Sequence, residues 1–292
     1  MPAYLMLWLI AIIWGLAFVA ESTGAQSLEP FSFNSAKFIF AIATLIPLTY
    51  LFPHKQTYQR KKLLLNGSLL GLFLFAGFTF QQAGLMYVNA GDASFISGTY
   101  IVIIPLIAMV FGQKIPISTW LGILITIIGL YKLSVGPNSN IEHGDIIELI
   151  GAFFWACHVL LIGHYAKTLP AIPLAITQFS FAAILSVCMA FIFETPKLEN
   201  YLIQWLPILY ISVVGFGIAS ILQIVAQRSV PASISGLIIS IAAVFAVIAD
   251  WLIMGVSPSP NTYLACSLIL LGIVVTQYPA LKRSPNIKSS HL

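Results

Sequence analysis

The sequence predicts an all-α polytopic membrane protein with ten transmembrane helices arranged as two inverted five-helix repeats. The first observation is composition: 59% of the residues are hydrophobic and only 8% are charged, whereas soluble domains carry about 25% charged residues. The second is a series of continuous apolar runs, and the third is a weak internal repeat. A chain this apolar cannot hide its side chains in one core, so lipid must solvate much of its surface.

The apolar runs are each close to the ~20 residues that an α-helix needs to cross a bilayer. They are continuous rather than alternating in period two, which favours helices over barrel strands. The first run has no basic residue before it, so we expect a retained span rather than a cleaved signal. The ten expected spans are 3–21, 31–52, 63–82, 93–112, 117–133, 146–164, 171–193, 205–225, 232–254 and 260–279.

The basic residues predict the orientation, because cytoplasmic loops of membrane proteins are enriched in lysine and arginine. With the N-terminus in the cytoplasm, only Lys132 and Lys197 fall outside, and Lys37 falls inside a span. Eight acids lie on or near the outer side, and Asp250 is the one acid placed deep in a span. Both termini should therefore be cytoplasmic. The inside segments hold Lys55, Arg60, Lys61, Lys62, Lys114, Lys167, Arg228, Lys282, Arg283 and Lys288.

The two halves of the chain resemble each other at a nearly constant offset. Trp14 and Trp155 are 141 residues apart, and STWLG at 118–122 aligns with NTYLA at 261–265, which is 143 residues further on. Five spans per half is an odd number, so the second half must enter the membrane in the opposite orientation. We expect a first repeat at 1–133, a periplasmic connection at 134–145, a second repeat at 146–279 and a cytoplasmic tail at 280–292.

Inverted repeats are the architecture of many secondary transporters, in which a site between the halves opens to either side in turn. No soluble domain, phosphate loop, nucleic-acid motif or Ser/His/Asp pattern stands out in the sequence. The three cysteines, Cys157, Cys188 and Cys266, have neither disulfide nor metal spacing. We therefore expect a transporter, with no enzymatic activity, no cofactor, no metal and no nucleic-acid partner.

Several segments carry a resemblance to a known family, the most specific being the run from Ala90 to Pro105. The others include IIWGLAF at 12–18, AKFIFAIATLIPL at 36–48 and QRSVPASISGLIIS at 227–240. With these segments the chain resembles the EamA-type ten-helix permeases of the drug/metabolite transporter superfamily. The resemblance implies a central cavity lined by the first, third, fourth, sixth, eighth and ninth spans. It also implies an inner-membrane location and cytoplasmic termini.

Two departures from the family pattern bear on energy coupling. Ala242 and Ala243 stand where many members have Glu-Pro, and Gln113 and Val256 stand where a Gly-Glu pair often closes a span. Some members of the family are thought to couple to protons through acidic groups. Proton coupling therefore stays an open alternative for this chain.

The function we expect is movement of a small organic metabolite, an amino acid or a related compound, by alternating access. The alternatives are uptake or exchange of a nucleotide-like metabolite and, less favoured, flipping of a lipid head group. The expected partners are the small-molecule substrate and membrane lipids, with the chain acting as a monomer or a homodimer.

Lys37 has two interpretations. It lies six residues into its span, at ~1.5 Å of rise per residue, so it could snorkel to the surface or form a structural pair. It could instead bind a carboxylate or phosphate of the substrate. Asp250 also has two interpretations. It could be a hydrogen-bonding or ion-pair partner at the outer interface, or it could be a proton-coupling group.

The remaining site candidates are polar or aromatic residues inside spans. Trp14 and Trp155 are repeat mates about eleven residues into their helices, and His158 shares a helix face with Trp155. Pro105 removes a backbone hydrogen bond and is the gating candidate, as a kink in the fourth span. The predicted substrate-binding residues are Trp14, Lys37, Gln82, Tyr100, Trp155, His158, Gln178 and Gln223.

Overall fold

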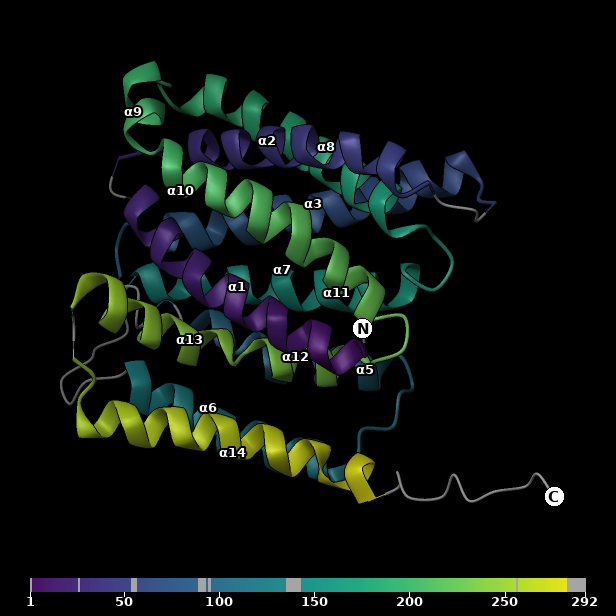
Figure 1. Cartoon of the computed structure of the whole chain (residues 1–292), viewed down its shortest axis with the longest axis vertical. Coiled ribbons are helices and arrows are strands. Elements are labelled where there is room, and N and C mark those ends of the chain that lie inside the picture. The colour runs from purple at the N-terminus through teal and green to yellow at the C-terminus, as the bar shows by residue number, and fades with distance from the viewer. Residues whose placement is uncertain are drawn as a thin grey trace.

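The computed structural model describes residues 2–25, 27–53, 57–88, 93, 96–134, 143–255 and 257–282. In these ranges the regular structure is helical, and the long helices run across the molecule in stacked layers (Figure 1). The expectation of an all-α chain is confirmed for them. The helices of the first half are α1 (Ala3–Gly24), α2 (Pro30–Leu51), α3 (Arg60–Gly84), α5 (Tyr100–Val110) and α6 (Ile117–Ser134).

The second half begins with α7 (His143–Tyr165) and α8 (Ala171–Phe193), followed by the short α9 (Leu198–Ile203). The eighth expected span is α10 (Trp205–Tyr210), the π-helix η1 (Ile211–Ala219) and α11 (Ser220–Ala226), which follow one another directly. The ninth is broken into α12 (Ala232–Ile239), α13 (Ala242–Ala249) and the π-helical turn η2 (Asp250–Met254). The last helix is α14 (Pro260–Lys282).

Seven helical stretches in the described residues are long and apolar enough to cross a membrane: 3–24, 30–51, 60–84, 143–165, 171–193, 205–226 and 232–253. Three further apolar helices are shorter, at Ile96–Val110, Ile117–Leu133 and Pro260–Thr276. Seven of the ten expected spans correspond to these stretches, and the other three overlap the shorter helices. The chain is a polytopic membrane protein.

Proline and carboxylate groups define where helices begin. Pro30 is the first residue of α2, where the missing N–H costs nothing and the fixed φ suits the helix. The carboxylate of Glu194, just after α8, accepts hydrogen bonds from the backbone N–H groups of Phe31 and Ser32 at 2.8 and 2.7 Å. A negative charge at a helix N-terminus satisfies free donors and complements the helix dipole. Glu194 therefore fixes the start of α2 against the end of α8.

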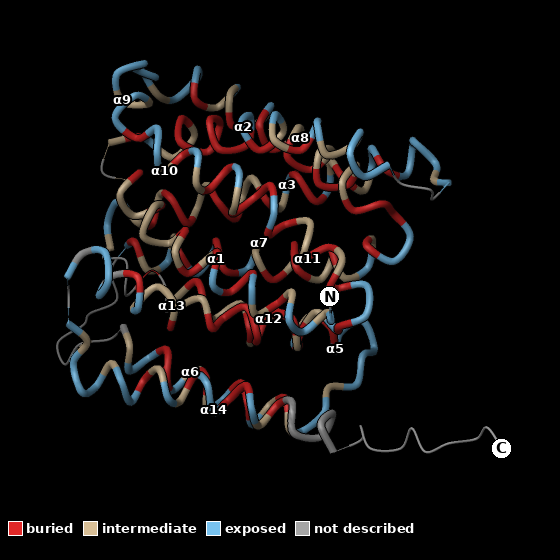
Figure 2. The backbone as a smooth tube through the Cα atoms, in the orientation of Figure 1, coloured by how far each residue is buried: buried red, intermediate tan, exposed pale blue. Residues whose placement is uncertain are grey.

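The helices pack in a regular pattern of pairs. Helix α2 packs on α8, α3 on α7, α6 along α14, α1 on α13, and α5 on both α7 and α12. Helix α1 also contacts α10, η1 and α11, while α2 and η1 pack together. Buried backbone runs through the middle layers, and exposed residues gather at the connections and on the outer faces (Figure 2).

The core of the upper layers in Figure 1 is aromatic. The rings of Phe38 on α2, Phe179 on α8 and Phe216 on η1 stack on one another with centroids 5.2–6.0 Å apart. Phe78 of α3 meets Phe38 and Phe216 edge-on. Such ring pairs contribute ~0.5–1.5 kcal/mol each beyond the area that they bury. This cluster joins α2, α3, α8 and η1 beside the cavity described next.

Candidate functional site

A cavity of about 130 Å³ lies in the middle of the bundle. One water needs ~10–15 Å³ by the same measure, so the cavity has room for a small organic molecule. Its walls come from α1, α3, the segment 97–100, α6, α7, η1, α11 and the break between α12 and α13. The expected cavity is present, and each of the six spans that the resemblance implied contributes residues to its wall. Leu130 of α6 is an addition that the resemblance did not imply.

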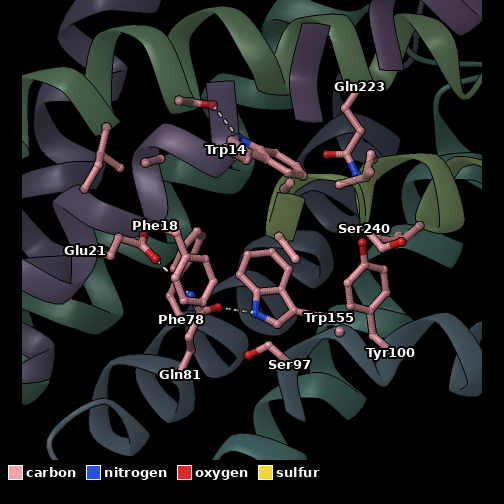
Figure 3. A pocket seen from close by; sticks show the side chains of 18 of the residues that line it. Trp14, Phe18, Glu21, Phe78, Gln81, Ser97, Tyr100, Trp155, Gln223 and Ser240 are labelled. Carbon is pink, nitrogen blue, oxygen red and sulfur yellow. Dashed lines mark hydrogen bonds between the residues drawn. The ribbon is translucent and has the colours of Figure 1, made fainter. Parts of the chain in front are cut away.

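Six large aromatic side chains of the described residues line the cavity, and Figure 3 labels five of them: Trp14, Phe18, Phe78, Tyr100 and Trp155. Trp14 of α1 donates its indole N–H to the carbonyl oxygen of Gly215 at 3.1 Å. The hydroxyl of Tyr100 donates to the carbonyl oxygen of Gly236 at 3.0 Å. Because each polar tip is already bonded to backbone, Trp14 and Tyr100 turn mainly apolar ring surface to a ligand.

A chain of hydrogen bonds crosses the wall from α7 to α2. The indole N–H of Trp155 donates to Oε1 of Gln81 at 2.8 Å, and Nε2 of Gln81 donates to Oε2 of Glu21 at 2.8 Å. The other carboxylate oxygen of Glu21 lies 3.0 Å from Nζ of Lys37. Trp155, Gln81 and Glu21 line the cavity. The network therefore holds a carboxylate at the wall with its negative charge compensated from behind.

Lys37 does not snorkel. Its side chain is fully buried, and its ammonium lies 4.4 Å from the ring centroid of Phe78 and 4.6 Å from that of Phe33. The structural pair was one of the two interpretations of Lys37, and Glu21 is that partner. Lys37 is absent from the cavity lining because the ring of Phe78 and the carboxylate of Glu21 stand there instead. Aromatic faces and a carboxylate both stabilise a desolvated ammonium.

Gln223 is a predicted binding residue that has an unpaired donor in the cavity wall. It lines the cavity, and its Nε2 has no hydrogen-bond partner among the described residues. Figure 3 shows Gln223 on α11 across the cavity from Gln81 and Ser97. Buried polar groups are normally paired, so an unpaired amide here is available to a ligand. Gln82, its predicted repeat mate, lies off the cavity with Nε2 at 3.4 Å from the carbonyl oxygen of Glu21.

His158 and Gln178 lie outside the cavity wall and bond to each other. Nε2 of His158 is 3.0 Å from Oε1 of Gln178, and both side chains are buried between α7 and α8. The ring of His158 meets Trp155 edge-on at 5.9 Å. His158 thus supports a cavity residue without touching the space. Of the eight predicted binding residues, Trp14, Tyr100, Trp155 and Gln223 are brought together in the wall, and Lys37, Gln82, His158 and Gln178 are not.

Glu21, Gln81 and Ser97 also line the cavity, and they were not predicted as binding residues from the sequence. Glu21 and Glu148 were expected on or near the outer side of the membrane; the structure adds that both side chains are buried inside the protein. Helical spacing could have found Glu21, because residues 14, 18 and 21 lie on one face of a helix. Gln81 was passed over for Gln82 because only Gln82 has a glutamine mate in the repeat.

Pro105 and Asp250 are the two remaining residues that the sequence singled out. Pro105 lies buried in the interior of α5, where it removes one backbone donor as expected; its gating role stays a prediction. The side chain of Asp250 lies outside the part of the molecule that is described.

The family model described as the EamA-like transporter family matches residues 1–135 and 143–278 of the sequence. The chain belongs to the EamA-like transporter family. The resemblance noted from the sequence is thereby confirmed, and membership indicates a transporter, with membrane lipids and a small-molecule substrate as its partners.

Relatives within the EamA-like transporter family support the assignment. An "Uncharacterized transporter" of Archaeoglobus fulgidus is 30% identical over 91% of this chain and 83% of its own length. The "Uncharacterized inner membrane transporter YedA" of Escherichia coli K12 is 30% identical over 53% of this chain and 51% of its own length. A solved structure, titled only as the crystal structure of a protein, is similar with a TM-score of 0.80 and 18% identity. It covers 97% of this chain and 98% of that chain, which indicates a shared fold.

Proposed function

We propose that the chain is an inner-membrane secondary transporter that moves a small organic metabolite, an amino acid or a related compound, by alternating access. The observation that carries the proposal is the cavity, lined by aromatic side chains, where helices of both halves of the chain meet. Trp14 and Trp155, one from each half, stand in its wall. A site between two halves that can rock against each other is what alternating access requires.

The inverted five-helix repeats are supported by the symmetry of the helix contacts. If each span corresponds to the span five places later, the pair α3–α7 corresponds to the pairing of η1 and α11 with α1. The pair α1–α13 corresponds likewise to α7–α5, while α2–α8, α5–α12 and α6–α14 correspond to themselves. A pseudo-two-fold axis would produce this pattern.

Single residues support the same symmetry. Trp14 of the first span bonds to the eighth span at Gly215, and Trp155 of the sixth span bonds to the third at Gln81. Gly112 and Gly255 end the fourth and ninth spans with φ of 77° and 72°, a conformation that glycine adopts at little cost. Their numbers differ by 143, the offset that relates 118–122 to 261–265.

The charge of the cavity favours an amino acid over a phosphate-bearing metabolite. Lys37 lies behind the wall and is neutralised by Glu21, and the lining contains no lysine or arginine among the described residues. Free phosphate groups are normally held by arginine or lysine. The free amide of Gln223 would bind a carbonyl or carboxylate, and the indole and phenol rings would hold an apolar side chain. Trp14, Tyr100, Trp155 and Gln223 are therefore our proposed binding residues.

Counterflow in proteoliposomes tests the proposal. We expect liposomes preloaded with a mixture of unlabelled amino acids to take up the labelled mixture faster than protein-free liposomes. A folded protein that exchanged no amino acid, nucleoside or cofactor would overturn the transporter assignment. Exchange of nucleotides alone, or movement of labelled lipid between leaflets, would establish one of the alternatives instead.

The orientation of the chain in the membrane has a separate test. We propose that both termini are cytoplasmic, since ten of the lysines and arginines then lie on the inner side and two on the outer. Helix α1 begins and α14 ends on the same side of the bundle (Figure 1). Alkaline phosphatase fused after Leu292 should be inactive in cells, and high activity would reverse the orientation.

A further inference from the structure

Glu148 is a fully buried carboxyl group in the second turn of α7. Its Oε2 accepts a hydrogen bond from the hydroxyl of Ser97 at 2.8 Å. Its Oε1 has no hydrogen-bond partner within the described ranges. An ionised carboxylate removed from water is costly unless it is paired with a cation and hydrogen-bonded. The hydroxyl of Ser97 supplies one hydrogen bond and no positive charge.

The oxygen that has no partner in the described residues lies against Gly84. Helix α3 approaches Glu148 at Gly84, where an added Cβ atom would lie 2.5 Å from Cγ and 2.7 Å from Oε1 of Glu148. Only glycine leaves space for the carboxyl group here. Oε1 therefore packs against the Cα of Gly84, which is a setting for a neutral acid rather than for a charge.

The charged groups nearest to Glu148 in the fold are carboxylates. Glu21 lines the same cavity as Ser97, and Asp145 precedes Glu148 by about one turn of α7. Lys37 of α2 pairs with Glu21, and His143 at the start of α7 contacts the ring of Tyr87 beyond α3. The segment that includes Ser97 contributes the hydroxyl. Among described residues no lysine or arginine forms an ion pair with Glu148.

Ser97 connects this carboxyl group to the transport cavity. Ser97 lines the cavity together with Glu21 and Gln81, and its hydroxyl is bonded to Glu148 behind the wall. A small separation of α7 from the segment around Ser97 would bring water to the carboxyl group. Its protonation would then follow the conformation of the cavity.

We propose that Glu148 and Ser97 form a proton-binding site that couples transport to a proton gradient. Glu148 holds a proton in the conformation described here. It releases that proton to water, becoming a carboxylate, when the bundle opens at the face where α1 ends and α7 begins. This inference rests on the proposed transport function, since it names the ion that drives the same cavity.

Infrared spectroscopy of the purified full-length protein tests the site without any substrate. At neutral pH the wild-type protein should show the C=O stretch of a buried protonated carboxyl group, and Glu148→Gln should lack it. Glu199→Gln, at an exposed acid on α9, is the matched control and should keep the band. Ser97→Ala should shift the band, because the carboxyl group loses its hydrogen bond. A band equally strong in wild type and Glu148→Gln, or absent from both, would overturn the proposal.

Transport of the labelled amino acid mixture into proteoliposomes tests the coupling. The wild type and Glu199→Gln should accumulate label in response to a pH gradient, whereas Glu148→Gln should lose accumulation and still exchange label in counterflow. Wild-type exchange that ignores a pH gradient, or follows a sodium gradient instead, would overturn the proton site and leave the transporter assignment intact. If the folded protein exchanges nothing, the transporter assignment fails, and the infrared result still decides whether Glu148 holds a proton.

Discussion

Nζ of Lys37 lies 3.0 Å from Oε1 of Glu21, and both side chains are buried between α1 and α2 beside the cavity. Each of the two charges neutralises the other inside the protein. The pair holds Glu21 at the cavity wall, where it accepts the hydrogen bond from Gln81 that in turn positions Trp155.

Lys37→Met should strongly destabilise the protein, because it leaves the carboxylate of Glu21 buried without a cation. Breaking a buried pair by removing one partner costs ~3–5 kcal/mol. The double variant Lys37→Met with Glu21→Gln should recover much of the loss. Thermal unfolding in detergent measures both. If Lys37→Met is as stable as wild type and only loses substrate affinity, Lys37 acts on the substrate and not through Glu21.

Gln223→Leu should weaken substrate binding without destabilising the fold, because its Nε2 has no partner to lose in the described structure. Loss of one hydrogen bond to a ligand corresponds to ~0.5–1.5 kcal/mol, or about twofold to twelvefold in affinity. Counterflow at varied substrate concentration measures the change.

Gln227→Leu is the matched control for Gln223→Leu. Nε2 of Gln227 donates to the carbonyl oxygen of Val159 at 3.0 Å, so Gln227→Leu should lower the unfolding temperature. Equal effects of the two variants on both stability and affinity would contradict the proposed role of Gln223.

Trp155→Phe should reduce substrate affinity more than Phe153→Leu does. Trp155 lines the cavity and bonds to Gln81, whereas Phe153, two residues earlier on α7, is 47% exposed on the outer face of the bundle. The loss of one hydrogen bond and part of a ring predicts about a tenfold decrease in affinity. Equal transport by both variants would remove Trp155 from the site.

Glu194→Ala should destabilise the protein by ~1–2 kcal/mol, because the first turn of α2 loses a carboxylate that accepts from two backbone N–H groups. Glu199→Ala, at an exposed acid in the same connection, should have no such effect. Thermal unfolding compares the two, and transport kinetics should be unchanged in both. Equal stability of the two variants would exclude the capping role of Glu194.

The sequence predicted the helices well because continuous apolar runs and proline at helix starts are local signals. The same signals could not reveal the π-helical stretch η1 or the break between α12 and α13, since both depend on how neighbouring helices pack. Trp14 and Trp155 were found through their spacing in the repeat, which is also encoded in the sequence.

Burial of polar residues could not be predicted in the same way. Glu21 and Glu148 sit near helix ends, which in sequence looks like exposure to the membrane surface. In the structure, α2, α3 and the segment around Ser97 cover them. The choice between Gln81 and Gln82 depended on the rotation of α3 about its axis, and one residue step is ~100°. Only packing against α1 and α7 fixes that rotation.

The ion pair of Lys37 and Glu21 has an electrical consequence. Moving one elementary charge across the membrane potential corresponds to ~2.3 kcal/mol per 100 mV. A pair with no net charge that moves as a unit contributes nothing to this work. Any voltage dependence of transport should therefore measure the charge of the substrate and of the proton on Glu148, and not a movement of Lys37. Patch-clamp or solid-supported-membrane currents would then count the charges carried in each cycle.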